Sequence, residues 1–240
     1  MSKPNSISLI LPVYRDKHTV IKVIDKSLKI LKKLRKKYEI LIIDDCCPEK
    51  SGLIALKRSK HNKKIKVYFH KKNLGYGAAI RTGLAKSRYE CIYTVDGDGE
   101  FGIYLNDLPR ILKKYKKNDL VITYRYKRRY KTTRIIISWA YNFILRLLFD
   151  IPFKDISSGA RLISKKLLQK VKLKTNSPFI GAELAIKAKF MGYKVDEVGI
   201  HSFPNTFRSG SSIVVKNILL TMRDVVILFY KIYIKRDINS

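Results

Sequence analysis

Two apolar stretches near the N-terminus decide the fold, Ile7-Ser-Leu-Ile-Leu-Pro-Val-Tyr14 and Tyr38-Glu-Ile-Leu-Ile-Ile-Asp-Asp45. Each is a nearly continuous hydrophobic run of strand length, which is typical of strands buried on both faces of a parallel sheet. The residues between them, 16–36, carry apolar side chains at helical spacing: Val20, Val23, Ile24, Leu28, Leu31 and Leu34. This order predicts a β-α-β unit, in which the helical crossover makes the two strands parallel.

The alternation of strands and helices continues through the chain. Further strands are predicted at residues 65–70, 91–95, 120–124 and 195–202, and further helices at 78–86, 105–115, 134–149, 181–191 and 213–234. The pattern predicts an α/β fold with a doubly wound, mostly parallel sheet and helices on both faces. Because 240 residues suffice for one large core, we predict a main domain at 1–212 and an amphipathic helix in 213–240.

The chain is strongly basic, with 51 Lys and Arg against 19 Asp and Glu and a net charge of +32. An acidic partner is therefore expected: nucleic acid, an anionic lipid surface or a phosphorylated substrate. A lysine-biased genome would give the same excess without any function. The basic residues are spread along helices, as between Lys29 and Lys37, which favours a broad attractive field over specific recognition.

The cysteines and the N-terminus indicate the cellular compartment of the protein. Cys46, Cys47 and Cys91 cannot all pair within one chain, and a disulfide between the adjacent two would be strained. This favours a reducing cytoplasm. The N-terminus lacks the apolar core of a signal peptide, and the sequence contains no run of about 18 uncharged apolar residues. We expect a cytoplasmic protein that does not span the membrane.

Polar residues follow the predicted strands at their carboxyl ends, where open parallel sheets bind their ligands. Asp44 and Asp45 end the second strand, and Arg125 follows the fifth. The segment Asp96-Gly-Asp98-Gly-Glu100 leaves the fourth and places three carboxylates at alternate positions. Such oxygen ligands suit Mg²⁺ or Mn²⁺, with positions left open for phosphate and water. The alternatives are a solvated acidic turn and a calcium loop, but the acid that closes a calcium loop at its twelfth position is missing.

Other motifs give weaker signals. Gly75-Tyr-Gly77 begins like a dinucleotide fingerprint but lacks the third glycine. The plainer interpretation is a helix N-terminus that approaches another group closely, such as a nucleotide. Asp44-Asp45-Cys46-Cys47 has no second Cys or His pair at zinc-ligand spacing. The chain also has neither a phosphate-binding Gly-Lys-Ser/Thr loop nor a G-x-S-x-G nucleophile motif.

As a set, these segments resemble the family 2 glycosyltransferases of the GT-A fold, and within them the dolichyl- and undecaprenyl-phosphate sugar transferases. The resemblance covers residues 7–212. It rests on five segments in this order: Ser8-Leu-Ile-Leu-Pro12-Val-Tyr14-Arg-Asp16, Asp44-Asp45, Asn73-Leu-Gly75-Tyr-Gly77-Ala-Ala, Asp96-Gly-Asp98 and Asp155-Ile-Ser-Ser-Gly159-Ala-Arg161-Leu.

The resemblance implies a role for each matching residue. The nucleoside would be held by Pro12, Tyr14, Asp16, Asp44 and Asp45, with Gly75 in the donor-binding loop that follows. The metal would be bound by Asp98 most directly, helped by Asp96 and Glu100. Donor phosphates would be contacted by Arg125 and Arg134, and a late loop containing Arg208 and Ser211 would fold over the donor. The chain departs from the family at Glu100, where Gln is common, and at Cys46-Cys47, which replaces Gly-Ser.

The implied chemistry is transfer with inversion at the anomeric carbon. A metal and arginines stabilise the nucleoside diphosphate as it leaves, without proton transfer. A lipid phosphate acceptor is already anionic and needs no base. A sugar hydroxyl needs one, and Glu183 is the candidate, its alternative being a structural acid at a helix N-terminus.

Two apolar helices bear on the membrane. Residues 134–149 carry a narrow polar stripe of Arg134, Ser138, Asn142 and Arg146, and residues 213–234 are similar. Either helix could lie in a membrane interface or pack against the sheet or a second subunit, and for the later helix we favour the membrane. We expect Leu228 and Phe229 on its lipid-facing side.

The sequence thus predicts a glycosyltransferase that moves a sugar from a nucleotide-sugar donor to a polyprenyl phosphate at the cytoplasmic face of the membrane. The runner-up is transfer to a sugar hydroxyl in cell-envelope polysaccharide or glycolipid synthesis. A basic nucleic-acid-binding protein is the distant alternative, because an acidic cluster at the strand ends would repel phosphate. An oligomer is possible, and the sequence identifies neither the sugar nor the nucleotide base of the donor.

Overall fold

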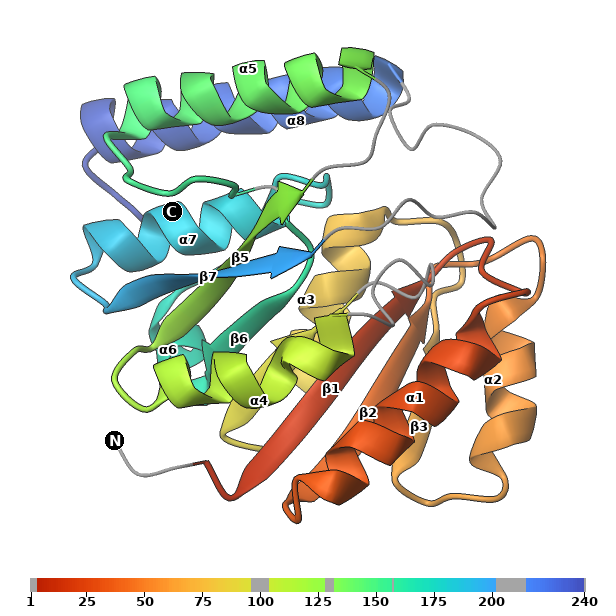
Figure 1. Cartoon of the computed structure of the whole chain (residues 1–240). Helices are drawn as coiled ribbons and strands as arrows, with labels where there is room; N and C mark the ends of the chain where they lie inside the picture. The colour runs from red at the N-terminus through yellow and green to blue at the C-terminus, as the bar shows by residue number, and fades with distance from the viewer. Residues whose placement is uncertain (1–3, 96–103, 128–131, 157, 202–214, 240) are drawn as a thin grey trace.

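The computed structural model describes residues 4–95, 104–127, 132–156, 158–201 and 215–239. At its centre is a seven-stranded sheet with the order β3-β2-β1-β4-β6-β5-β7 (Figure 1). The strands are β1 (Ser6–Val13), β2 (Lys37–Asp44), β3 (Ile65–Phe69), β4 (Cys91–Thr94), β5 (Leu120–Lys127), β6 (Arg161–Ser164) and β7 (Val195–His201). Strand β6 is antiparallel to both of its neighbours, and the other pairs are parallel. The predicted mostly parallel α/β sheet is confirmed.

The helices are α1 (Val20–Lys33), α2 (Ser51–Ser59), α3 (Tyr76–Lys86), α4 (Tyr104–Tyr115), α5 (Thr132–Phe149), α6 (Lys165–Lys170), α7 (Ile180–Phe190) and α8 (Val215–Phe229), which continues as a π-helix, η2 (Tyr230–Ile234). Every strand and helix predicted from the sequence is present within a few residues. Three elements were not predicted: α2, β6 and α6. Helix α2 buries only Ser51, Gly52 and Ala55, so it has no apolar stripe to recognise, and β6 is four residues long.

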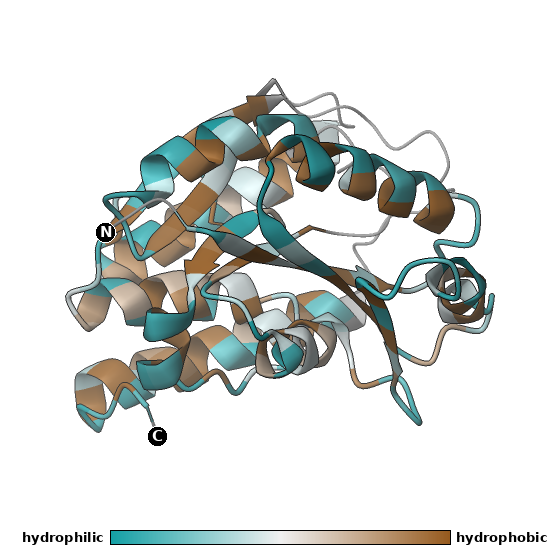
Figure 2. Cartoon of the chain, turned by 90° about the horizontal axis from the view of Figure 1, so that it is seen from below, coloured by the Kyte–Doolittle hydropathy of each residue, from teal (hydrophilic) through white to brown (hydrophobic). Residues whose placement is uncertain are grey.

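Helices cover both faces of the sheet and make two separate cores. Alternate residues of β1 divide between them: Leu9 and Leu11 pack with α1 and α4, whereas Ile10 packs with α3 and α7. In Figure 2 the inner side of α1 is hydrophobic and its outer side hydrophilic, as its buried residues require. This alternation is what a strand buried on both faces produces.

Helices α5 and α8 form a further layer outside α7 (Figure 1). Phe149, at the end of α5, lies 6.1 Å from Phe229 and 6.4 Å from Tyr233 between ring centroids, and Tyr233 also contacts Phe190 of α7. Residues from all three helices belong to the same core. Within the described ranges, none of the helices combines the length and hydrophobicity needed to cross a membrane.

Candidate functional site

The ends of β1 and β2 lie side by side and are joined by hydrogen bonds. Val13 pairs with Asp44 in the strand register. Beyond it, the Asp16 carboxylate accepts a hydrogen bond from Tyr14 N (2.9 Å), and Asp16 N donates to Ser51 Oγ (2.9 Å). Arg15 adopts a φ of 60° and its N–H donates to Cys47 Sγ at 3.0 Å. The two turns are therefore held as one unit, and Asp16 is buried within it.

Asp44 shapes the turn that follows β2. Its Oδ1 accepts from Cys47 N (2.7 Å) and its Oδ2 from Gly52 N (2.6 Å), at the start of α2. A Cβ at Gly52 would lie only 2.3 Å from Oδ2, so the close approach requires glycine there. These contacts favour a structural role for Asp44, and its proposed contact with the nucleoside stays a prediction.

Asp45 organises the loop that leads into α3. Its Oδ1 accepts from Leu74 N (2.9 Å) and faces His70 Nδ1 at 2.7 Å, while its Oδ2 accepts from Gly75 N (2.8 Å). Gly75 has a φ of 96°, which explains the glycine. The structure therefore gathers Tyr14, Asp16, Asp45 and Gly75 at the carboxyl edge of the sheet, where the sequence predicted Asp45. Pro12 lies buried within β1 itself.

The second glycine of this loop approaches the protein's own backbone. Gly77 N donates to Asn176 O at 2.8 Å, and a Cβ on Gly77 would lie 2.7 Å from backbone atoms of Thr175, Asn176 and Ser177. Arg81 reinforces the contact by donating to Lys174 O and Asn176 Oδ1. The expectation that this close approach serves a nucleotide is corrected for Gly77, because residues 175–177 occupy that position.

Arg125 lies at the end of β5, three strand positions from β1. It binds Asp155 with two hydrogen bonds, from Nε at 2.7 Å and from Nη2 at 3.2 Å, and both side chains are largely buried. A bidentate carboxylate fixes the direction of a guanidinium. Its contact with donor phosphate stays a prediction. Arg134 lies in the first turns of α5, and its side chain is outside the described part of the structure.

Glu183 is buried in the first turn of α7 and is fully engaged by the protein. Its carboxylate accepts from Lys174 N, Thr175 N and Thr175 Oγ1 at 2.8–3.2 Å. It also pairs at 2.9 Å with Lys187, whose side chain is 1% exposed. A general base needs access to the proton that it removes. The structure therefore favours the structural alternative for Glu183, which holds the segment that contacts Gly77. Lys187, its partner, was not identified from the sequence.

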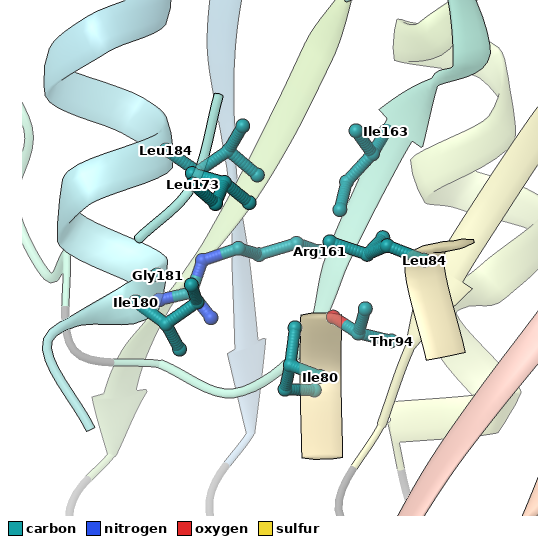
Figure 3. A pocket seen from close by; sticks show the side chains of 9 residues that line it. All are labelled: Ile80, Leu84, Thr94, Arg161, Ile163, Leu173, Ile180, Gly181 and Leu184. Carbon is teal, nitrogen blue, oxygen red and sulfur yellow. The ribbon is translucent and has the colours of Figure 1, made fainter. Parts of the chain in front are cut away.

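Arg161 of β6 lies in the interior between the sheet and α7 (Figure 3). Its Nη2 donates to Ile156 O at 2.7 Å, and a Cβ on Gly181 would lie 2.0 Å from the same nitrogen. Burial raises the pKa of the nearby Tyr141 hydroxyl, against the opposing charge of Arg161. The cavity beside Arg161 has a volume of about 10 Å³, which is room for at most a single water molecule. It is no substrate site, and the arginine of this segment is a buried structural group.

The predicted metal ligands and the late loop lie outside the described residues: Asp96, Asp98, Glu100, Arg208 and Ser211. Val95, the last residue described before that gap, donates its N–H to Ile10 O at 3.0 Å. The chain therefore leaves β4 at the same edge as the β1 turn. In the part of the chain that is described, no group of three His, Cys, Asp or Glu side chains is placed to bind a metal. The metal site stays a prediction.

Sequence comparison places the chain among glycosyltransferases. The model of "Glycosyl transferase family 2" matches residues 8–172. The undecaprenyl-phosphate mannosyltransferase of Micrococcus luteus is 28% identical over 196 residues, which cover 78% of this chain and 74% of that protein. The human dolichyl-phosphate β-glucosyltransferase is 30% identical over 105 residues, 41% of this chain. The chain spans about a third of the human protein and of a Trichomonas vaginalis relative, 32% and 37% of their lengths.

Comparison with solved structures confirms the fold. Glucosyl-3-phosphoglycerate synthase from Mycobacterium tuberculosis, crystallised with Mn²⁺, uridine diphosphate and phosphoglyceric acid, superposes with a TM-score of 0.70. It is 15% identical, and the alignment covers 92% of this chain and 76% of that one. At this identity the likeness is one of fold, and it agrees with the GT-A architecture expected from the sequence.

Proposed function

The chain belongs to glycosyl transferase family 2, and from this premise we propose that it transfers a sugar from a nucleotide-sugar donor to a polyprenyl phosphate at a membrane surface. Inversion at the anomeric carbon is part of the proposal. Named relatives that act on undecaprenyl and dolichyl phosphate support the acceptor class. The observation that carries the proposal is the outward orientation of the apolar side chains of α5 and α8.

Helix α5 buries the polar Asn142 together with Leu145 and Phe149, and it exposes several large apolar side chains. Asn142 is 3% exposed, and its Oδ1 accepts from Ile156 N at 2.8 Å. On the opposite side Trp139 is 60% exposed, Phe143 47% and Leu147 73%. The polar stripe predicted for this helix thus points partly into the protein. Large exposed apolar patches usually mark a partner or a membrane.

Helix α8 and η2 continue this surface. Their inner side consists of Asp224, Val225, Leu228 and Ile232. Leu228 is therefore buried, and Phe229 packs against the core, so the expectation that these two meet lipid is wrong. The exposed residues of the two helices make up what we call the apolar outer face: Ile136, Ile137, Trp139, Phe143, Leu147, Ile218, Leu219, Met222, Val226, Ile227, Tyr230, Tyr233 and Ile234.

A lipid surface suits this face better than a protein surface does. Aromatic and aliphatic side chains are accompanied by the exposed cations Arg223, Lys235 and Arg236, a combination typical of helices in a membrane interface. The net charge of +32 adds long-range attraction to anionic headgroups. Docking here would bring a lipid acceptor to the protein. The rival occupant, a second copy of the chain, is an outcome of the test below.

The chemistry at the site would need little from the chain beyond binding. Asp45 and the Tyr14–Asp16 turn would hold the nucleoside, and Arg125 would face the phosphates. A divalent cation, Mg²⁺ or Mn²⁺, held by Asp98 with Asp96 and Glu100, would stabilise the departing diphosphate. A phosphate acceptor requires no general base, which agrees with the engaged carboxylate of Glu183.

An acceptor assay tests the proposed reaction. The protein is incubated with Mg²⁺ or Mn²⁺, each common nucleotide sugar, and either undecaprenyl phosphate or free oligosaccharides. Sugar transfer to the lipid phosphate is the expected result, with none in excess chelator. Transfer to sugar hydroxyls alone would establish the runner-up function in polysaccharide or glycolipid synthesis. Nucleic-acid binding with no nucleotide-sugar binding would overturn both.

Vesicle flotation tests the docking face separately. Leu147→Ser with Leu219→Ser removes two of its most exposed side chains, and the expected result is loss of binding to anionic vesicles at high salt. Leu53→Ser with Leu56→Ser, on α2 away from this face, is the matched control and should bind as wild type does. If the wild-type protein does not bind vesicles but forms a dimer that the same double substitution disrupts, the face contacts a second subunit instead.

A further inference from the structure

His70 joins the ends of β2 and β3 to the middle of α3. Its Nδ1 lies 2.7 Å from Asp45 Oδ1, and its Nε2 lies 2.9 Å from Thr82 Oγ1. The side chains of His70 and Asp45 are 9% and 6% exposed. Because a carboxylate only accepts, the Nδ1 position must carry the proton. In the neutral imidazole, Thr82 then donates to Nε2, so the order of hydrogen bonds is set from Thr82 through His70 to Asp45.

The connection of a hydroxyl, an imidazole and a carboxylate also occurs in hydrolases, where it activates a nucleophile. Thr82 is not placed for that chemistry. It lies in the interior of α3, where backbone N–H groups are bonded within the helix and cannot form an oxyanion hole. Its hydroxyl instead serves as the outer support of the imidazole.

The hydrogen bonds that Asp45 makes with described residues leave one acceptor position of its carboxylate for a ligand. Two carboxylate oxygens offer about four lone-pair sites. His70 and Leu74 N occupy Oδ1, and Gly75 N occupies one site of Oδ2. The backbone amides come from a glycine-containing loop, whereas His70 comes from a strand end and is braced by a helix. The imidazole is therefore the rigid contact that sets the plane of the carboxylate.

We propose that His70, supported by Thr82, is a positioning residue for nucleotide binding: it directs the remaining Oδ2 lone pair of Asp45 towards the base of the donor. This rests on the proposed function, in which Asp45 contacts the nucleoside. An acceptor in that position favours a base whose ring nitrogen carries a proton, as in uracil or guanine, over one whose corresponding nitrogen is unprotonated, as in cytosine or adenine. His70 then affects binding of the donor and leaves the transfer step alone.

The test compares two substitutions at the same position. His70→Leu removes the contact to Asp45, whereas His70→Asn keeps an N–H at the place of Nδ1. We expect His70→Leu to weaken binding of UDP or GDP with Mg²⁺ about tenfold by calorimetry, and to raise the donor KM similarly with kcat within about twofold. His70→Asn should restore most of the affinity. His61→Leu, at an exposed histidine, is the matched control.

Each outcome decides a different question. Unchanged nucleotide affinity in folded His70→Leu overturns the positioning role alone. A loss that His70→Asn does not restore, together with a lower melting temperature for both variants, also overturns it, because a purely structural histidine behaves in that way. If the wild-type protein binds no nucleotide, both the proposed function and the positioning role are overturned. Thr82→Val should give a smaller loss in the same direction as His70→Leu.

Discussion

Helices α1 and α5 both bury apolar side chains, but they differ in what they expose. Helix α1 buries Ile24 and Leu28 and exposes lysines such as Lys29. Helix α5 buries Leu145 and Phe149 together with the polar Asn142, and it exposes the apolar Trp139. One helix therefore gives its apolar side to a core and its polar side to solvent, whereas the other carries large apolar residues on both its inner and its outer side.

The difference teaches that periodicity identifies a helix but does not tell which of its apolar side chains are buried. Helix α1 lies directly on the sheet, where its aliphatic side chains fill the core with those of β1. On the inner side of α5, Asn142 accepts a hydrogen bond from the buried Ile156 N–H, and Phe149 packs in the core. The apolar residues on the far side of α5, such as Trp139, stay exposed.

The largest expected effect is on stability at α1. Ile24→Ala should lower the free energy of unfolding by about 2–5 kcal/mol, because it leaves a cavity beneath the helix. Ile136→Ala, at a residue of α5 that is 58% exposed, should change it by less than about 0.5 kcal/mol. Urea unfolding of both variants measures the contrast. Equal losses would mean that Ile136 is packed against protein as Ile24 is.

The next effect concerns lipid binding at α5. Trp139 is the only tryptophan and stacks on Phe143 at 5.4 Å, so its emission reports on this face. We expect a blue shift on adding anionic vesicles, and Phe143→Ser should weaken that binding about tenfold, since burying such a side chain is worth about 1.5–3 kcal/mol. Phe69→Ser, at a similarly exposed residue of β3, should leave vesicle binding unchanged. Emission that vesicles leave unchanged would contradict a lipid-facing α5.

A smaller effect is expected at the buried Asn142 of α5. Asn142→Ala should destabilise the protein by about 1–3 kcal/mol, because it leaves the buried Ile156 N–H without its acceptor. Thr133→Ala, exposed in the same helix, should stay within about 0.5 kcal/mol. Thermal or urea denaturation measures both. A stabilised Asn142→Ala variant would show that the Ile156 N–H does not need this acceptor.

The smallest effect is expected on the outer side of α1. Lys29→Ala should change the free energy of unfolding by less than about 0.5 kcal/mol, because this lysine is exposed. Its effect on vesicle binding should also stay well below that of Phe143→Ser, measured by the same change in Trp139 emission. A loss as large as that of Phe143→Ser would place α1, instead of α5, against the lipid.

Much of the fold and part of the site followed from local pattern. The continuous apolar runs of β1 and β2 predicted a parallel sheet, and the strand-end argument placed Asp44 and Asp45 at its carboxyl edge. Helix α2 and strand β6 were missed because each is short and carries little periodicity. His70 was passed over because a single histidine has no local signal, and its partners are 25 and 12 residues away.

The sequence by itself determined most of the strands and helices, and the family of the chain, because period, strand-end residues and motif spacing are local properties of the chain. The tertiary structure alone decided what each polar side chain contacts. From the sequence, Glu183 is equally consistent with a general base and with a structural acid. The structure shows Lys187 and the backbone amides of residues 174–175 bound to its carboxylate. The same holds for which side chains of α5 are buried. Burial and hydrogen bonding depend on residues distant in sequence, and only folding brings them together.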